Sequence, residues 1–141
     1  MQIREARESD YEEIMPLMNI FVGEDRYSRH DGDSYKKVLQ SPTNFAFVVE
    51  DKGKIIGFVT SSIRTIIRYP KPIMELDELF VVEEYRKQGI GKQLIEKIES
   101  LAKEKDCHRM YIASADRFTT AHKFYEGLGY TKYGYHFYKN F

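Results

Sequence analysis

The stretch Arg86-Lys87-Gln88-Gly89-Ile90-Gly91 joins an apolar run, Leu79-Phe80-Val81-Val82, to an amphipathic segment at about residues 90–105. This order predicts a strand, a short basic turn with two glycines, and then a helix. Such a turn directs several backbone N–H groups and a helix N-terminus toward one point, which favours an anion, usually a phosphate. Gly89 and Gly91 carry no Cβ atom, so a ligand can approach the backbone closely.

Two common phosphate-binding patterns do not match this turn. A P-loop requires Gly-x4-Gly-Lys-Ser/Thr, and no Ser or Thr follows Lys92. A dinucleotide-binding fingerprint requires Gly-x-Gly-x-x-Gly, and Leu94 stands at the third glycine position. The turn therefore predicts an anion site of another class.

Length and composition narrow the class of protein. The 141 residues predict a single domain over residues 1–141 that is long enough to bury a core. The net charge is +0, from 22 basic and 22 acidic residues, so no nucleic-acid partner is expected. No apolar run is long enough to span a bilayer and the first residues do not read as a secretion signal, so we expect a cytoplasmic protein without a membrane partner. The single cysteine, Cys107, excludes an intramolecular disulfide and a multi-thiolate zinc site, and we expect no metal.

Periodicity and turn signals divide the chain into strands and helices. Strands are predicted over residues 2–6, 45–49, 55–67, 73–82, 109–113 and 130–138, and helices over residues 10–22, 35–40, 90–105 and 120–126. Ser9 is expected to cap the first helix, and residues 23–34 are expected to form a polar loop. The order predicts an α/β fold, a mixed sheet with helices packed against it.

Two motifs resemble those of the GNAT N-acetyltransferase superfamily. The pattern Leu79-Phe80-Val81-x4-Arg86-x-x-Gly89-x-Gly91 resembles the signature in which R/Q-x-x-G-x-G/A binds the pyrophosphate of acetyl-coenzyme A. The segment Ala121-His122-Lys123-Phe124-Tyr125-Glu126-Gly127-Leu128-Gly129-Tyr130 is similar to the family pattern A-x-x-F-Y-x-x-x-G-F/Y. The resemblance implies a single-domain α/β fold, whose mixed, mostly antiparallel central sheet is flanked by helices and contains a splayed parallel strand pair.

The resemblance also implies that acetyl-CoA is the cosubstrate. The pantetheine arm would pair, like an added strand, with backbone groups of Leu79, Phe80 and Val81. The diphosphate would be bound by the turn, which comprises Arg86, Lys87, Gln88, Gly89, Ile90 and Gly91.

Acetyl transfer to an amine requires a neutral amine, a stabilised oxyanion and a proton for the departing thiolate. The resemblance assigns the proton donor to Tyr125, a phenol that is protonated at neutral pH. Phe124, the preceding residue, is expected to lie in the core. The oxyanion would be bound by a backbone N–H near Phe80 or Val81.

The base is expected on the strand that leads to Leu79. Relatives place a Glu or His at the positions of Glu75 or Asp77, often acting through water; a chain of waters without a dedicated base is the alternative. Strand periodicity places Glu75, Asp77, Leu79 and Val81 on one face and Glu78 on the other.

The predicted function is the acetyl-CoA-dependent transfer of an acetyl group directly to a primary amine of a small molecule or peptide. Phe118 stands where many enzymes that acetylate protein N-termini carry Asn, so a close match to those enzymes is not expected. The alternative is a non-catalytic CoA-binding sensor or interaction module.

Two further features can be explained either by a functional role or by packing and solvation alone. The aromatic residues near the C-terminus either pack in the fold, line the acceptor pocket or join two copies of the chain in a homodimer. The acidic residues of the 23–34 loop, namely Glu24, Asp25, Asp31 and Asp33, either attract a cationic amine or are simply solvated.

Overall fold

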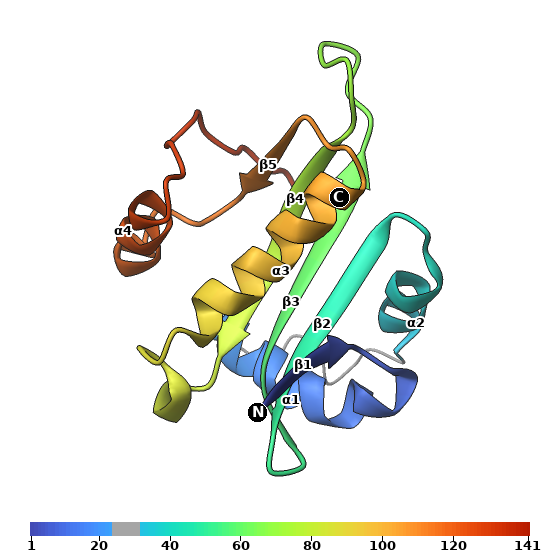
Figure 1. Ribbon diagram of the computed structural model, residues 1–141, viewed down its shortest axis with the longest axis vertical. Helices are drawn as coiled ribbons and strands as arrows, with labels where there is room; N and C mark the ends of the chain where they lie inside the picture. The colour runs from blue at the N-terminus through green and yellow to red at the C-terminus, as the bar shows by residue number, and fades with distance from the viewer. Residues whose placement is uncertain (24–31) are drawn as a thin grey trace. The chain divides into compact units, whose positions relative to one another are not determined.

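The computed structural model describes residues 1–23 and 32–141 (Figure 1). It contains two compact units, Met1–Tyr111 and Ile112–Phe141, and each is described by itself. Among the described helices, none combines the length and the apolar character that crossing a membrane requires.

A five-stranded sheet forms the centre of the first unit. Its strands lie in chain order: β1 (Gln2–Glu5), β2 (Asn44–Asp51), β3 (Lys54–Arg64), β4 (Ile73–Val81) and β5 (Arg109–Ile112). Strands β1 to β4 pair antiparallel with their neighbours, and β4 and β5 form the parallel pair. The mixed, mostly antiparallel sheet expected from the sequence is confirmed.

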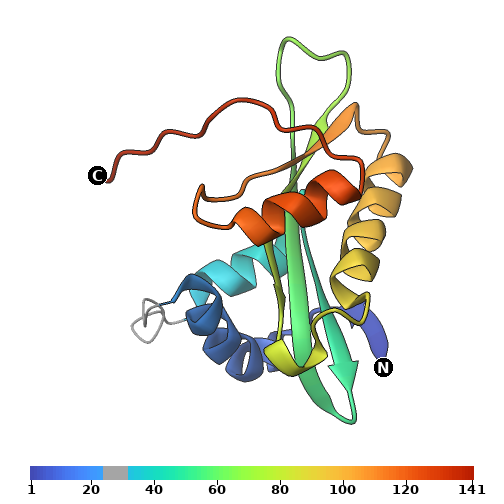
Figure 2. The same ribbon diagram turned by 90° about the vertical axis from the view of Figure 1, so that its left-hand side faces the viewer.

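Helices cover both faces of this sheet (Figure 2). The short helix η1 (Glu8–Asp10), α1 (Tyr11–Val22) and α2 (Asp33–Gln40) belong to one layer, whereas η2 (Glu83–Tyr85) leads into α3 (Ile90–Glu104) on the opposite face. Apolar side chains at helical spacing bury α3 against β3 and β4. These buried residues are Ile90, Leu94, Ile95, Ile98 and Ala102.

The core on the α1 side of the sheet is apolar and partly aromatic. It comprises Ile14, Met18, Val48, Ile55, Phe58 and Phe80. The Phe58 and Phe80 rings, from neighbouring strands, stack with their centroids 5.8 Å apart. This core fixes α1 against the strand that precedes the basic turn.

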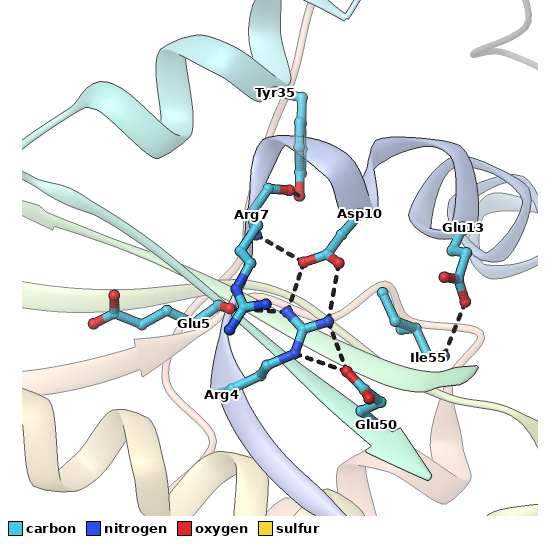
Figure 3. Close-up of polar contacts among 8 residues, drawn as sticks. All are labelled: Arg4, Glu5, Arg7, Asp10, Glu13, Tyr35, Glu50 and Ile55. Carbon is cyan, nitrogen blue, oxygen red and sulfur yellow. Dashed lines mark hydrogen bonds and ion pairs between the residues drawn. The ribbon is translucent and has the colours of Figure 1, made fainter. Parts of the chain in front are cut away.

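A partly buried polar cluster joins β1 to the start of α1 (Figure 3). The Arg4 guanidinium donates to both carboxylate oxygens of Asp10, at 2.7 and 3.0 Å, and to Glu50 at 2.8 Å. The Asp10 carboxylate also accepts the Arg7 N–H at 2.7 Å, and the Tyr35 hydroxyl donates to the Arg7 carbonyl at 2.7 Å. Since Tyr35 belongs to α2, the cluster ties both helices to the edge of the sheet.

The predicted N-cap of the first helix is wrong by one residue. Ser9 lies inside η1, and Asp10 is the residue that precedes α1. Asp10 prefers this place because its carboxylate is held by the Arg4 side chain and the Arg7 N–H, which Ser9 could not replace with one hydroxyl. Further along α1, the Glu13 carboxylate accepts the Ile55 N–H at 3.1 Å and so fixes α1 to the start of β3 (Figure 3).

The boundaries of the loops differ modestly from expectation. Strand β3 ends at Arg64 rather than at Ile67, because the following residues lead into Pro70 and Pro72, which cannot donate hydrogen bonds to a sheet. Gly23 ends α1 in the left-handed conformation. Residues 24–31, with the acidic side chains of Glu24, Asp25 and Asp31 that were considered for amine binding, lie outside the described residues, and Asp33 begins α2.

The second unit contains one helix, α4 (Thr119–Gly127), among its described residues. The strand predicted over residues 130–138 is absent from the structure of this unit, and that prediction is wrong. The alternating aromatic pattern does not suffice, because a strand needs a partner for its N–H and C=O groups and this unit contributes no second strand of its own. The side chains of Tyr135, Phe137 and Tyr138 are largely exposed.

Candidate active site

The basic turn has the backbone geometry expected of an anion site. Gly89 precedes α3 with φ 81°, and Lys87 also has a positive φ of 61°. Gly89 is the N-cap residue and has no side chain that could bond to the first-turn N–H groups of α3. The first turn of α3 contains no acidic residue. A Cβ atom at Gly89 would meet nothing within 4 Å, so glycine is favoured here by the left-handed backbone rather than by crowding.

Two long side chains of the turn hold its own backbone in place. The Arg86 Nε donates to the Val81 carbonyl at 2.8 Å, with the guanidinium 5.6 Å from the Phe80 ring centroid. The Gln88 side chain donates to the Glu84 carbonyl at 3.0 Å. An anion at this turn would therefore meet mainly the backbone N–H groups and the charge of Arg86 and the exposed Lys87.

The end of β4 presents backbone groups to the edge that faces away from β3. The Val82 N–H donates to the Ile56 carbonyl of β3 at 2.9 Å. Because successive residues of a strand point their backbone groups to opposite sides, those of Val81 and Leu79 point away from β3. Phe80 points its backbone groups toward β3 and its ring into the core, and its contact with a cofactor stays a prediction.

The short strand β5 can cover only part of this edge. The His108 N–H donates to the Pro72 carbonyl at 2.7 Å, directly before both strands begin. From there β4 continues for nine residues and β5 for four. The residues Leu79 to Val81 therefore extend beyond the end of β5, which is the geometry that an added extended ligand requires.

A β-bulge in β4 changes the face on which its carboxylates lie. Thr60 of β3 lies opposite Glu78, but the next residue, Ser61, lies opposite Leu76. Asp77 is therefore an extra residue without an opposite partner. After such an insertion, the simple alternation of faces no longer holds along the strand.

The bulge brings three carboxylates to one face. Every second residue of β3 contacts one of them: Thr60 Oγ1 donates to Glu78, Ser62 bonds to Asp77, and Arg64 pairs with Glu75 at 2.9 Å. The predicted separation of Glu78 from Glu75 and Asp77 is thus wrong. The prediction that Leu79 and Val81 share a face with these carboxylates is also wrong. The two residues lie opposite Val59 and Gly57, whose side of the sheet is the other face.

Of the three carboxyl groups, Glu78 has the environment of a base. Burial, followed by the charge of Asp77, raises its pKa to about 7. Glu75 is held in its ion pair with Arg64. Burial of the carboxyl raises the pKa of Asp77 as well, but this carboxyl already accepts a hydrogen bond from Ser62. The prediction places the base at Glu75 or Asp77, following the resemblance, and the alternating pattern carries no signal for the inserted residue that brings Glu78 to the same face.

A cavity of about 230 Å³ adjoins Glu78 in the first unit. It lies between α1, α2 and the sheet. The lining residues include Ile14, Met15 and Met18 of α1, Tyr35 and Val38 of α2, and Phe58, Thr60 and Glu78 of the sheet. The Thr60 and Glu78 side chains bond to each other and form the polar corner of this cavity.

Tyr125 lies in α4, in the second unit. Burial raises the pKa of its phenol, so it stays protonated at neutral pH. Its backbone carbonyl accepts the N–H groups of Leu128 and Tyr130 at 3.0 and 3.1 Å, which ends the helix one turn after the tyrosine. Phe124 is 38% exposed, so the expectation that it is a core residue is wrong.

Comparison with known proteins agrees with this geometry. Residues 4–130 match the model of the acetyltransferase (GNAT) family. An aminoglycoside N(6')-acetyltransferase type 1 from Salmonella typhimurium is 28% identical over 98 residues, which cover 67% of this chain and 68% of that protein.

Solved structures share the fold over nearly the whole chain. A protein described as a transcriptional regulator from Bacillus halodurans superposes with a TM-score of 0.90 at 23% identity, covering 99% of both chains. The aminoglycoside N-acetyltransferase AAC(6')-Iy, solved in complex with CoA, superposes with a TM-score of 0.81 at 23% identity, covering 99% of this chain and 98% of that one.

Proposed function

The chain belongs to the acetyltransferase (GNAT) family, and from that membership we propose that it transfers the acetyl group of acetyl-CoA directly to a primary amine of a small molecule or peptide. One observation carries the proposal: β4 has a cavity with a carboxylate of raised pKa on one face, and η2 then joins it to a basic turn whose glycine precedes α3 with a positive φ. An acceptor amine and a diphosphate donor can therefore be bound along one short segment, residues 78–91.

The donor side of the site suits acetyl-CoA. The Arg86–Gly91 turn would hold the diphosphate, and the outward backbone groups of Leu79 would pair with the amide-containing arm. The Val81 carbonyl already accepts the Arg86 side chain. Bound acetyl-CoA supplies an activated acetyl thioester. The N–H of Val81 is the backbone donor that we assign to the developing oxyanion, because it points away from β3.

Glu78 is the base in this proposal. A carboxylate with a pKa near neutrality can accept a proton from a bound ammonium and release it to solvent at the pH of the reaction. The neighbouring charge of Asp77 attracts the cationic amine to the same face, whereas that of Glu75 is paired with Arg64. The neutral amine then forms the C–N bond as the C–S bond breaks, and the departing thiolate takes a proton.

Tyr125 is the proton donor that we assign to this thiolate, since its raised pKa keeps it protonated. Tyr125→Phe should lower kcat by about 100-fold, the usual contribution of a general acid, without weakening acetyl-CoA binding. Tyr135→Phe, at a largely exposed tyrosine, is the control and should keep the wild-type kcat. An unchanged kcat in Tyr125→Phe would remove this residue from the mechanism.

The proposal is tested by incubating the protein with acetyl-CoA and a panel of primary amines, including amino acids, peptides, polyamines and amino sugars. Free thiol should appear together with an N-acetylated product identified by mass spectrometry. Binding of acetyl-CoA without thiol release for any amine would instead identify the chain as a non-catalytic CoA-binding module. No binding of acetyl-CoA would contradict both interpretations.

We further infer that residues 1–141 act as one N-acetyltransferase domain, since the family model spans both units. Exposed aromatic residues near the C-terminus, among them Tyr135, Phe137 and Tyr138, support pairing of two copies in a homodimer. Sedimentation of the protein and of a variant with these residues changed to Ser would detect such a dimer. A reducing cytoplasmic location is supported by the free thiol of Cys107.

A further inference from the structure

The cavity next to Glu78 is lined mainly by apolar side chains. Nine of its fifteen lining residues are Ala, Val, Ile, Met or Phe. Glu78 is the one carboxylate among these described residues, and none of them is a lysine or an arginine. The cavity therefore offers one negative group to a ligand and an apolar wall to the rest of it.

Two of the hydroxyl groups around this cavity are already used inside the protein. The Tyr35 hydroxyl donates to the Arg7 carbonyl at 2.7 Å, and burial raises the pKa of this tyrosine to about 12. The Thr60 hydroxyl donates to Glu78. A ligand rich in hydroxyl groups would thus lose hydrogen bonds to water that these two donors do not replace.

The size of the cavity sets a second limit. Its volume of about 230 Å³ exceeds the ~150 Å³ of a cavity that binds benzene, and lies below the ~300–1,000 Å³ of sites for drug-sized ligands. A single ring with a short chain fits this range. A ligand of several linked rings would extend beyond the apolar walls into solvent.

We propose, on the basis of the acetyl-transfer function above, that the acceptor is a small primary amine with one ammonium group on an apolar body, such as an arylalkylamine. The ammonium lies at the Glu78 carboxylate, and the apolar body packs against Phe58 of β3 and Met15 and Val38 of the covering helices. Polyamines carry more cationic groups than the cavity can pair, and phosphorylated amino sugars carry an anion that would meet Glu78 instead of a cation.

The first experiment measures kcat/KM with acetyl-CoA for phenethylamine, spermidine, kanamycin and phosphorylated glucosamine. Phenethylamine should exceed each of the other three by about 100-fold, the discrimination expected from burying one aromatic ring. Turnover of kanamycin, spermidine or the amino sugar with little or none of phenethylamine would overturn this inference and leave the acetyl-transfer function intact. Binding of acetyl-CoA without thiol release for any primary amine would overturn both.

The second experiment fills the cavity. Val38→Phe places a ring in the cavity from a partly exposed position of α2, whereas Ile20→Phe adds a ring at the exposed surface of α1, outside the lining. Val38→Phe should raise the KM for phenethylamine about tenfold, and Ile20→Phe should not change it. Retained acetyl-CoA affinity, measured by isothermal titration, shows that each variant is folded.

A third variant covers the case in which Val38→Phe fails to fold. Val38→Ala enlarges the cavity, so it should improve kcat/KM for a naphthyl-substituted ethylamine relative to phenethylamine. If both Val38 variants keep the wild-type KM values and the wild-type preference, the cavity does not hold the acceptor and the inference is wrong.

Discussion

Glu78, the base that we propose, destabilises the folded protein when it is ionised. Its pKa of about 7 in the folded protein lies above the ordinary 4.5, because burial disfavours the charged form. The folded state therefore binds the Glu78 proton more tightly than the unfolded state does. Below the ordinary pKa of 4.5, Glu78 is protonated in both states and does not change the free energy of unfolding with pH. As the pH rises from there through about 7, the unfolded state releases this proton first and the protein loses stability.

Glu78→Gln should consequently stabilise the protein at high pH. The free energy of unfolding, measured with urea, should exceed that of the wild type at about pH 8, and this gain should shrink toward about pH 5. Glu104→Gln, at the exposed end of α3, is the control and should show no pH-dependent difference. A gain of the same size at both pH values would contradict the burial of an ionised Glu78.

At the scale of elements, the turn before α3 could be predicted from the sequence, because the backbone at this position needs a positive φ and glycine adopts it without strain. Gly53, in the hairpin between β2 and β3, also has a positive φ, of 74°, and open space at the Cβ position. The two glycines therefore differ in location but not in backbone strain, which makes them a matched pair.

Gly89→Ala should weaken acetyl-CoA binding about tenfold, because the left-handed conformation costs an L-residue about 1–2 kcal/mol and binding requires it. Gly53→Ala should reduce the free energy of unfolding by a similar amount and leave acetyl-CoA binding unchanged. Isothermal titration measures the affinities of both variants. Equal affinities in the two variants would show that the turn before α3 does not bind the cofactor.

The junction of β1 and η1 depends on a charge that is sensitive to acid. The hydrogen bonds from Arg4 hold the pKa of Asp10 below its usual value, so the unfolded state binds the Asp10 proton more readily than the folded state. Its contribution to stability is therefore present above about pH 4 and is lost as the pH falls through the lower, folded-state pKa.

Asp10→Asn should lower the free energy of unfolding at neutral pH by about 3 kcal/mol, since it leaves the largely buried Arg4 without its bidentate partner. The difference from the wild type should narrow in acid, where Asp10 itself becomes protonated. Asp116→Asn, at an exposed position, is the control. Urea unfolding at neutral and acidic pH makes the comparison, and a loss that is equal at both would contradict the ion pair.

The bulge in β4 shows where strand patterns stop being informative. The sequence predicts the strand itself, because its apolar residues and its place before the basic turn are local signals. The inserted Asp77 depends instead on the pairing with β3, between Thr60 and Ser61. Since one extra residue reverses the faces that follow, the alternation predicted from the sequence separates Glu78 from Glu75 and Asp77, whereas the structure brings all three to one face.

For the whole molecule, the first unit was predictable and the C-terminal segment was not. Strands β2 to β4 follow one another through turns with clear signals, so the order of elements determines their pairing. A strand over residues 130–138 would depend on a partner that is distant in the sequence, and alternating aromatic residues cannot specify one. The cavity likewise arises from three separate segments, and its volume has no signature in the sequence.

The pH dependence of kcat/KM tests the central claim, that this chain acetylates an amine that Glu78 deprotonates, most directly. In the wild type, kcat/KM for a primary amine should rise with an inflection near pH 7, as the free protein loses the Glu78 proton. Asp77→Asn should move the inflection to lower pH, because it removes a charge that raises this pKa. Glu78→Gln should lose the inflection and lower the rate by about 100-fold. A Glu78→Gln enzyme that keeps both the wild-type rate and the inflection near pH 7 would contradict the account.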